Sequence, residues 1–301
     1  MIDEARLREC LAGWWGLARP CVQPHHGGMN SGTWLVAQDG RRWVAKAVPP
    51  EQKSAVAAGL AVAARLERAG VPAGAAVPTA GGQLVADVDG TAVGLLTWVG
   101  GDPLTGADDS QQDLIGRTLG RVHHLLTGVD ADLAGAQVQR FHWIDTDADH
   151  LAIRPWIRPA VAAAVAAYDQ SGPASLTWGL LHADPAPEAF RLDAATGVCG
   201  VIDWQAALVG PLMYDVASAV MYVGGPARAG ALLSAYQRQQ VLSGAEIDRA
   251  LPVMLRMRWA VQADYFARRI AIGDLTGIAG PADNETGLED ARQRLTGDGG
   301  R

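Results

Sequence analysis

The hydrophobic pattern of this chain changes character once, near residues 98–101, and this change restricts the possible folds more than any other feature. Ahead of it, a helical first 20 residues are followed by strand-like runs around one Ala-rich helical pattern over 51–69. Beyond it, helical periodicity dominates. We therefore expect an α+β fold, with a small antiparallel β-sheet and one helix in residues 1–98 and a larger, mainly α-helical part in residues 99–301.

The individual elements follow from the same patterns and from the Gly and Pro residues that bound them. Strands are predicted at 33–36, 42–48, 83–88 and 93–99, and two more short ones at 176–181 and 200–202. Helices are predicted at 112–127, 158–170, 213–223, 227–241, 245–272 and 286–296.

Composition excludes several classes of protein. The chain has 25 Lys and Arg against 32 Asp and Glu, and this net charge of −7 argues against non-specific binding to nucleic acid. No apolar run approaches the roughly 20 residues of a membrane span, and the acidic N-terminus does not resemble a signal peptide. Three cysteines without a CxxC pair fit a reducing compartment. We expect a cytoplasmic protein without membrane or nucleic-acid partners.

Two carboxylates lie on loops beside the short strand-like runs of the second part. Asp184 follows the run at 176–181, and Asp203 ends the run at 200–202. Such a pair suits a site in which one Asp orients a hydroxyl group and the other holds a divalent ion. Taken alone, Asp184 equally fits a turn, because two prolines follow it closely.

Three segments in order resemble the signature of the aminoglycoside phosphotransferase family, the small-molecule branch of the protein-kinase-like fold. His182-Ala183-Asp184 stands for the HGD triplet, 200–204 reads GVIDW, and 210–217 reads GPLMYDVA, which resembles GxxxxDxA. The resemblance extends over about 25–270. It implies a bilobal kinase-like fold, with a nucleotide-binding lobe at 1–98 and a catalytic and substrate-binding lobe at 99–301. It also implies transfer of the γ-phosphate of ATP or GTP to a small-molecule hydroxyl, with magnesium.

The resemblance also implies residue roles. Asp184 would orient the attacking hydroxyl, Asp203 would coordinate magnesium, and His182 and Asp215 would support the catalytic loop. Lys46, one of only two lysines, matches the strand lysine that contacts the nucleotide phosphates. Further nucleotide contacts are expected from the Gly-rich turn and from the segment that joins the lobes. Trp98 in that segment is either near the base or part of the core. The expected contact residues are Gly28, Ser31, Gly32, Thr97, Trp98 and Val99.

Two family positions are altered. The family has a metal-binding Asn five residues after the catalytic Asp, where this chain has Ala189, and we expect Glu188 to serve as the surrogate ligand. Gly59 occupies the site of the Glu that pairs with the lysine, and Glu51 or Glu67 is a possible substitute. Because of these losses, a second interpretation stays open, in which the protein is a pseudokinase that binds nucleotide without catalysis.

The acceptor is expected against the C-terminal helices and the loop 139–150. Acidic and aromatic residues there suit an aminoglycoside. Arg268 and Arg269 equally suit an anionic acceptor such as a nucleoside antibiotic. Without any acceptor-binding role, the charged residues also fit a solvent-exposed surface and the aromatic rings fit the apolar core. Antibiotic resistance is the favoured role, and a metabolic kinase of the homoserine, choline or sugar-amine type is the alternative. The candidate acceptor-binding residues are Trp143, Asp145, Trp259, Asp264, Tyr265 and Arg268.

Overall fold

A five-stranded antiparallel sheet forms the N-terminal part of the computed structural model, which describes residues 2–25, 31–129, 132–133, 136–137, 139–141 and 144–297. The strand order is β1-β2-β3-β5-β4. The sheet agrees with the predicted hairpins, and it adds one strand, β1, whose four residues are too few to show an alternating pattern. The strands are β1 (Cys21–Pro24), β2 (Gly32–Gln38), β3 (Arg41–Val48), β4 (Ala86–Val88) and β5 (Thr91–Thr97).

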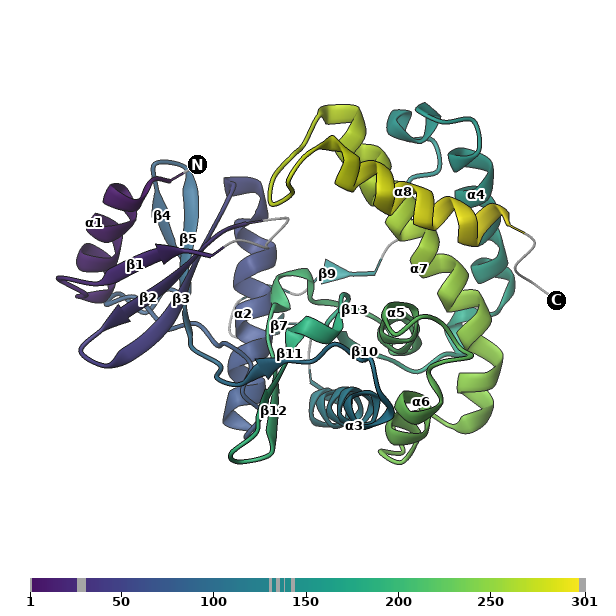
Figure 1. The fold of residues 1–301 in the computed structure, drawn as a ribbon, viewed down its shortest axis with the longest axis horizontal. Coiled ribbons are helices and arrows are strands. Elements are labelled where there is room, and N and C mark those ends of the chain that lie inside the picture. Colours follow the sequence, from purple (N-terminus) through teal and green to yellow (C-terminus); the bar gives the residue numbers. More distant parts are fainter. Residues whose placement is uncertain are drawn as a thin grey trace.

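Two helices lie against this sheet, α1 (Glu4–Trp15) and α2 (Lys53–Arg68) (Figure 1). Successive side chains of β3 point alternately toward α1 and toward α2, because neighbouring residues of a strand face opposite sides of the sheet. Ala45 and Ala47 join the apolar cluster that includes Leu7 and Leu11 of α1. Val48 joins the cluster that includes residues of α2. Each face of the sheet therefore has a helix packed against it, and the face toward α1 is the more deeply buried.

Six α-helices make up most of the rest of the described chain, which follows the connecting residues 98–101 (Figure 1). Nine of the ten residues of α5 are buried, because the other helices and short strands surround it. Within the described residues no helix is long and apolar enough to span a bilayer. The helices are α3 (Asp109–Leu126), α4 (Ile157–Gln170), α5 (Met213–Tyr222), α6 (Gly230–Gln237), α7 (Gly244–Ile272) and α8 (Pro281–Thr296).

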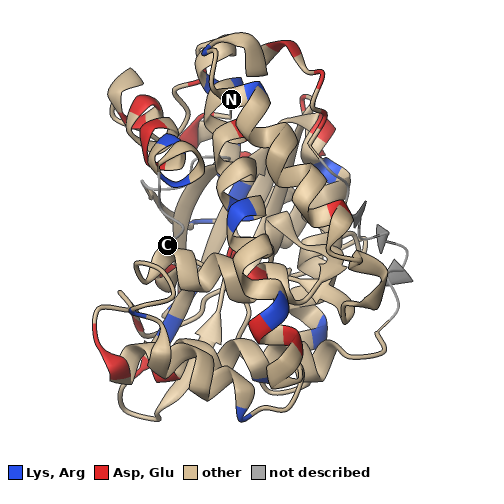
Figure 2. Cartoon of the chain, turned by 90° about the vertical axis from the view of Figure 1, so that its right-hand side faces the viewer, with Lys and Arg blue, Asp and Glu red and all other residues tan. Residues whose placement is uncertain are grey.

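Charged positions of both signs are interspersed on the side of the molecule shown in Figure 2. Several pair with each other on the surface, including Arg154 with Glu285 and Arg292 with Glu289. Such exposed pairs contribute little to stability. The helical part is therefore held mainly by its apolar core.

Short strands in the helical part hold the two carboxylate loops. One loop joins β10 to β11 and carries Asp184, and the other joins β12 to β13 and carries Asp203. The patterns predicted β10 and β12 but not their partners: Gly210 and Pro211 in β13 mark a break in the pattern, and β11 alternates over only four residues. The strands are β6 (Asp102–Pro103), β7 (Asp132–Leu133), β8 (Ala136–Gln137), β9 (Gln139–Arg140), β10 (Trp178–Leu181), β11 (Phe190–Asp193), β12 (Val198–Val201) and β13 (Leu208–Pro211).

Helix α2 lies directly on the backbone that follows Asp203. A Cβ atom added to Gly59 would lie 2.0 Å from the carbonyl oxygen of Trp204, well inside van der Waals contact. The helix therefore has no room for a side chain at this position. At the position where the family resemblance implies a glutamate, the structure thus has room only for glycine.

Each carboxylate loop contains a non-glycine residue in the left-handed region. Ala183 has φ +70° and Asp203 has φ +76°. For an L-residue this conformation costs about 1–2 kcal/mol. Ala183 stands where the family resemblance has glycine, which adopts such a φ freely.

Replacing Gly59 by Ala is expected to lower the free energy of unfolding by about 1–3 kcal/mol, the usual cost of overpacking. The matched control is Gly13→Ala in α1, where nothing lies within 4 Å of the added Cβ. That change is expected to raise stability by about 0.5–1 kcal/mol. Urea unfolding of both variants checks the pair, and equal effects would contradict the packing described.

Replacing Ala183 by Gly is expected to raise the free energy of unfolding by about 0.5–1 kcal/mol, because relief of the left-handed strain exceeds the added flexibility of the unfolded chain. Ala186, with φ −66°, provides the control. Ala186→Gly is expected to destabilise by about 0.4–1 kcal/mol. Thermal and urea unfolding measure both, and a loss of stability in Ala183→Gly would refute the prediction.

Candidate active site

The loop after β10 is anchored to α5 by the fully buried carboxylate of Asp215. Its Oδ2 accepts the backbone N–H of His182 at 2.7 Å, and its Oδ1 accepts that of Ala183 at 2.8 Å. His123 of α3 places Nε2 3.1 Å from Oδ2, and its Nδ1 lies 2.8 Å from the hydroxyl of Tyr236. Because three donors surround it, the buried charge is compensated and fixes the loop.

His182 connects the two carboxylate loops. Its Nε2 lies 2.8 Å from the carbonyl oxygen of Ile202, and its Nδ1 accepts the backbone N–H of Asp184 at 3.3 Å. The ring also meets Trp204 edge to face, with 4.7 Å between centroids. These contacts fix the residues next to Asp184 and Asp203 relative to each other.

Lys46 of β3 forms an ion pair with Asp203, with 2.5 Å between Nζ and Oδ1. Burial alone would raise the pKa of Asp203, but the Lys46 ammonium, with help from His182, holds this pKa below its ordinary value. Asp203 therefore remains an anion at neutral pH. The pair joins the sheet to the second carboxylate loop.

Glu67 and Glu51 do not take the place of the missing glutamate beside Lys46. Glu67 instead accepts hydrogen bonds from the Thr97 hydroxyl at 2.6 Å and from the backbone N–H groups of Ala75 and Ala73 at 3.0 and 3.4 Å. Glu51 is exposed on the turn before α2. Glu67 therefore ties the end of β5 to the segment after α2.

Asp184 is held through one of its two carboxylate oxygens. Oδ1 accepts the hydroxyl of Tyr222 at 2.6 Å and Nη2 of Arg258 at 3.0 Å. Within the described residues Oδ2 has no hydrogen-bond partner, and the side chain is 52% exposed. Burial chiefly raises the pKa of Tyr222, Asp184 acts in the same direction, and Arg258 opposes both. Tyr222 thus stays protonated and donates to Asp184.

Sequence reasoning missed Tyr222 and Arg258. Arg258 lies on α7 among buried Met254, Met257 and Ala260, where helical periodicity predicts an apolar side chain. A charged residue at such a position was the available signal. Tyr222, at the end of α5, offered none.

The predicted nucleotide-binding residues lie at opposite ends of the strands: Gly32 pairs with Ala47 near the end of β3, and Thr97 pairs with Trp43 near its start. Ser31 is buried, with its hydroxyl 3.2 Å from that of Thr33, and Gly32 pairs with Ala47, the neighbour of Lys46. Gly28 lies outside the described residues. Thr97 ends β5 and is followed by Trp98 and Val99.

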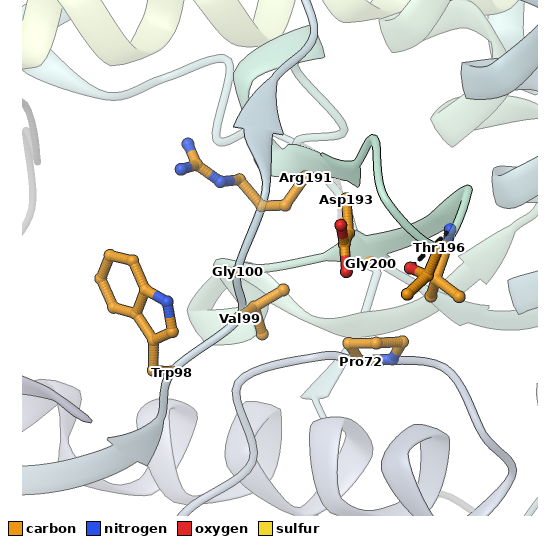
Figure 3. Close-up of a pocket in the computed structure, with 9 residues that line it drawn as sticks. Pro72, Trp98, Val99, Gly100, Arg191, Asp193, Thr196 and Gly200 are labelled. Atoms are coloured by element: carbon orange, nitrogen blue, oxygen red, sulfur yellow. Dashed lines mark hydrogen bonds between the residues drawn. The ribbon is translucent and has the colours of Figure 1, made fainter. Parts of the chain in front are cut away.

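Trp98 and Val99 line a cavity of about 310 Å³ (Figure 3). Arg42 lies over the Trp98 ring at 4.7 Å, and the buried Nε1 of Trp98 has no hydrogen-bond partner in the described part of the chain. This cavity does not include Lys46 or Asp203, which line a separate small hollow next to α2. The cavity at Trp98 therefore adjoins the junction of the two parts rather than the carboxylates.

The residues present fit a magnesium–phosphate group. No cluster of three or more His, Cys, Asp or Glu suited to a metal occurs in the ranges that the structure describes. Magnesium, however, commonly uses one or two carboxylates together with substrate phosphates and water. Asp203 is ionised, and Glu188 is exposed on a turn near Asp184, whereas the methyl group of Ala189 is buried. Oxygen donors are thus available on both loops.

The predicted acceptor-binding residues do not form one group. Asp264 accepts from His150 at 2.7 Å, and Trp259 packs in the cluster of α4, α7 and α8 beneath Arg294. Asp145 and Arg268 are exposed, and Trp143 is not among the described residues.

Tyr265 lies two helical turns beyond Arg258, on the same face of α7. Burial mainly, and also the charge of Asp184, raise the pKa of Tyr265, whereas Arg269 lowers it. Its hydroxyl accepts a hydrogen bond from Nη1 of Arg269 at 3.3 Å.

Known proteins share both sequence and fold with this chain. A homoserine kinase from Xanthobacter autotrophicus is 30% identical over 190 residues, which is 58% of this chain and 57% of that protein. This match spans little more than half of the relative. An amicoumacin kinase in complex with AMP-PNP and Ca²⁺ has a TM-score of 0.74 at 15% identity, covering 98% of this chain and 93% of that one. A microcompartment-associated aminopropanol kinase has a TM-score of 0.73 at 18% identity, covering 99% of both chains.

The match to a family model covers most of the chain. The model, described as the phosphotransferase enzyme family, aligns with residues 22–252 and so includes the sheet, both carboxylate loops and α5. The likeness to solved kinases shows the same bilobal architecture. The chain therefore belongs to the aminoglycoside phosphotransferase family of enzymes, as its three sequence segments predicted.

Proposed function

We propose that this protein transfers the γ-phosphate of ATP or GTP to a hydroxyl group of a small molecule, with magnesium as the metal ion. The observation that carries the proposal is the state of Asp184: Oδ1 is held by two donors, and Oδ2 is open within the described residues. A base or orienting group must reach the acceptor proton directly, and an accessible carboxylate oxygen meets this need.

The chain's own residues account for the transfer step. The acceptor oxygen forms a bond to the γ-phosphorus while the bond from that phosphorus to the oxygen bridging to the β-phosphorus breaks, and the nucleoside diphosphate leaves. The hydroxyl proton passes to Oδ2 of Asp184. Lys46, now paired with Asp203, would contact phosphate oxygens when nucleotide is bound, and Ser31, Gly32 and the segment 97–99 would position the nucleotide.

Asp203 and Glu188 would hold magnesium. When bound, the ion would neutralise charge on the phosphates. Asp203 is suited to this role because its low pKa keeps it ionised.

Two acceptor classes have support. A hydroxylated antibiotic is supported by the structural likeness to an amicoumacin kinase. A small amino alcohol is supported by the alignment with a homoserine kinase and the likeness to an aminopropanol kinase. Antibiotic resistance and metabolic phosphorylation are the corresponding roles, and a screen of nucleotide consumption over both panels separates them.

Replacing Asp184 by Asn is expected to lower kcat at least about 10²-fold on any acceptor that the screen identifies, because the amide cannot accept the proton. Nucleotide affinity is expected to be unchanged. Asp169→Asn, an exposed change at the end of α4, is the control and is expected to keep full activity. Activity of Asp184→Asn within tenfold of the parent would show that Asp184 is not the base. Nucleotide binding without turnover on either panel would instead favour a pseudokinase.

Replacing Glu188 by Ala is expected to raise the magnesium concentration needed for half-maximal activity by about tenfold or more, because a hard oxygen ligand is lost. A magnesium titration at saturating nucleotide measures the change. Glu51→Ala, exposed on the turn before α2, is the matched control. An unchanged magnesium requirement in Glu188→Ala would remove Glu188 as a ligand.

A further inference from the structure

Arg258 is a buried cation whose only carboxylate partner among the described residues is Asp184. The Arg258 residue is 8% exposed, and its Nη2 lies 3.0 Å from Oδ1 of Asp184, whose side chain is half exposed. Removing a guanidinium from water is costly, and a partly solvated partner returns little of that cost. Stability therefore does not explain why an arginine occupies this position of α7.

The guanidinium is fixed from more than one side. Its Nε donates to the hydroxyl of Ser218 at 3.1 Å, and its Nη2 also donates to the hydroxyl of Tyr222 at 3.0 Å. The Tyr222 hydroxyl in turn donates to Oδ1 of Asp184. Ser218 and Tyr222 both belong to α5, the helix that carries Asp215. The same helix thus holds the Asp184 loop by its backbone and, through this network, by its side chain.

These contacts select between the two carboxylate oxygens of Asp184. Both donors meet Oδ1, so rotation of the carboxylate would break two charge-assisted hydrogen bonds. Oδ2 consequently keeps one orientation and remains the oxygen open to a ligand. The guanidinium also offsets the negative charge of Asp184 where a polyphosphate must approach.

We propose that Arg258, together with Tyr222, is a positioning residue for phosphoryl transfer: the pair holds Oδ1 of Asp184 so that Oδ2 meets the acceptor hydroxyl. This inference rests on the proposed role of Asp184 as the proton acceptor. It assigns Arg258 to the chemical step and not to nucleotide binding, because its described partners are Asp184, Tyr222 and Ser218.

The test measures kcat, KM and nucleotide affinity in four variants, with Arg256→Met, an exposed arginine of the same helix, as the matched control. Arg258→Met is expected to lower kcat about 10²-fold, the usual effect of a misplaced catalytic group, with KM for nucleotide and nucleotide affinity unchanged. Arg258→Lys keeps the positive charge but loses the planar guanidinium with its several N–H donors, and we expect kcat to fall about tenfold. Tyr222→Phe is expected to lower kcat by up to about tenfold. Added guanidinium is expected to restore part of the activity of Arg258→Ala.

The outcomes separate this inference from the proposed function. Release of phosphate from nucleotide with water as acceptor is measured in parallel, because it needs no identified substrate. If Asp184→Asn is inactive while folded Arg258→Met keeps kcat within threefold, the proposed function stands and the positioning role is wrong. If Arg258→Met does not fold, the kcat values of Arg258→Lys and Tyr222→Phe test the positioning role instead. Unchanged kcat in both variants would overturn the inference. If Asp184→Asn keeps activity within tenfold of the parent, Asp184 is not the proton acceptor, and this inference fails together with that role.

Discussion

The buried carboxylate of Asp215 is the constraint on which the site depends. A charge removed from water must be compensated, and here the backbone N–H groups of His182 and Ala183 and the ring of His123 provide the compensation. Loss of any of these contacts would leave the buried carboxylate with fewer donors than its desolvation requires. The loop is consequently held in one conformation against α5, and this rigidity allows a strained residue, Ala183, to persist next to Asp184.

The sheet joins this rigid unit by a different route. Since Gly59 brings α2 against the backbone at Trp204, the helix itself positions the segment carrying Asp203. Lys46 then pairs with Asp203 directly, without an intervening glutamate. Glu67 is free to fix the end of β5 through Thr97. The loss of the expected glutamate is here accompanied by closer packing, and Lys46 and Asp203 remain together.

Local patterns predicted the division into a sheet part and a helical part, but not the surroundings of Asp184. The longer elements were predictable because β3 alternates and α3 is periodic over many turns, whereas the four-residue strands β1, β11 and β13 were missed. Asp184, Asp203 and Lys46 were found because they stand in short ordered motifs. Tyr222, Arg258 and His123 were missed because their partners are far away in sequence. Tyr222 and Arg258 contact Asp184 over 38 and 74 residues, and His123 contacts Asp215 of α5 over 92. Only tertiary packing brings such residues together.

The distribution of charge around the loops follows from these contacts. Three carboxylates lie on or beside the two loops, and each is balanced differently: Asp215 by backbone donors and His123, Asp203 by Lys46, and Asp184 by Arg258. Both cations contact carboxylates that remain partly exposed, so positive charge already lies beside Asp184 and Asp203. With nucleotide bound as proposed, the triphosphate would add its negative charge next to two paired carboxylates rather than two unpaired anions.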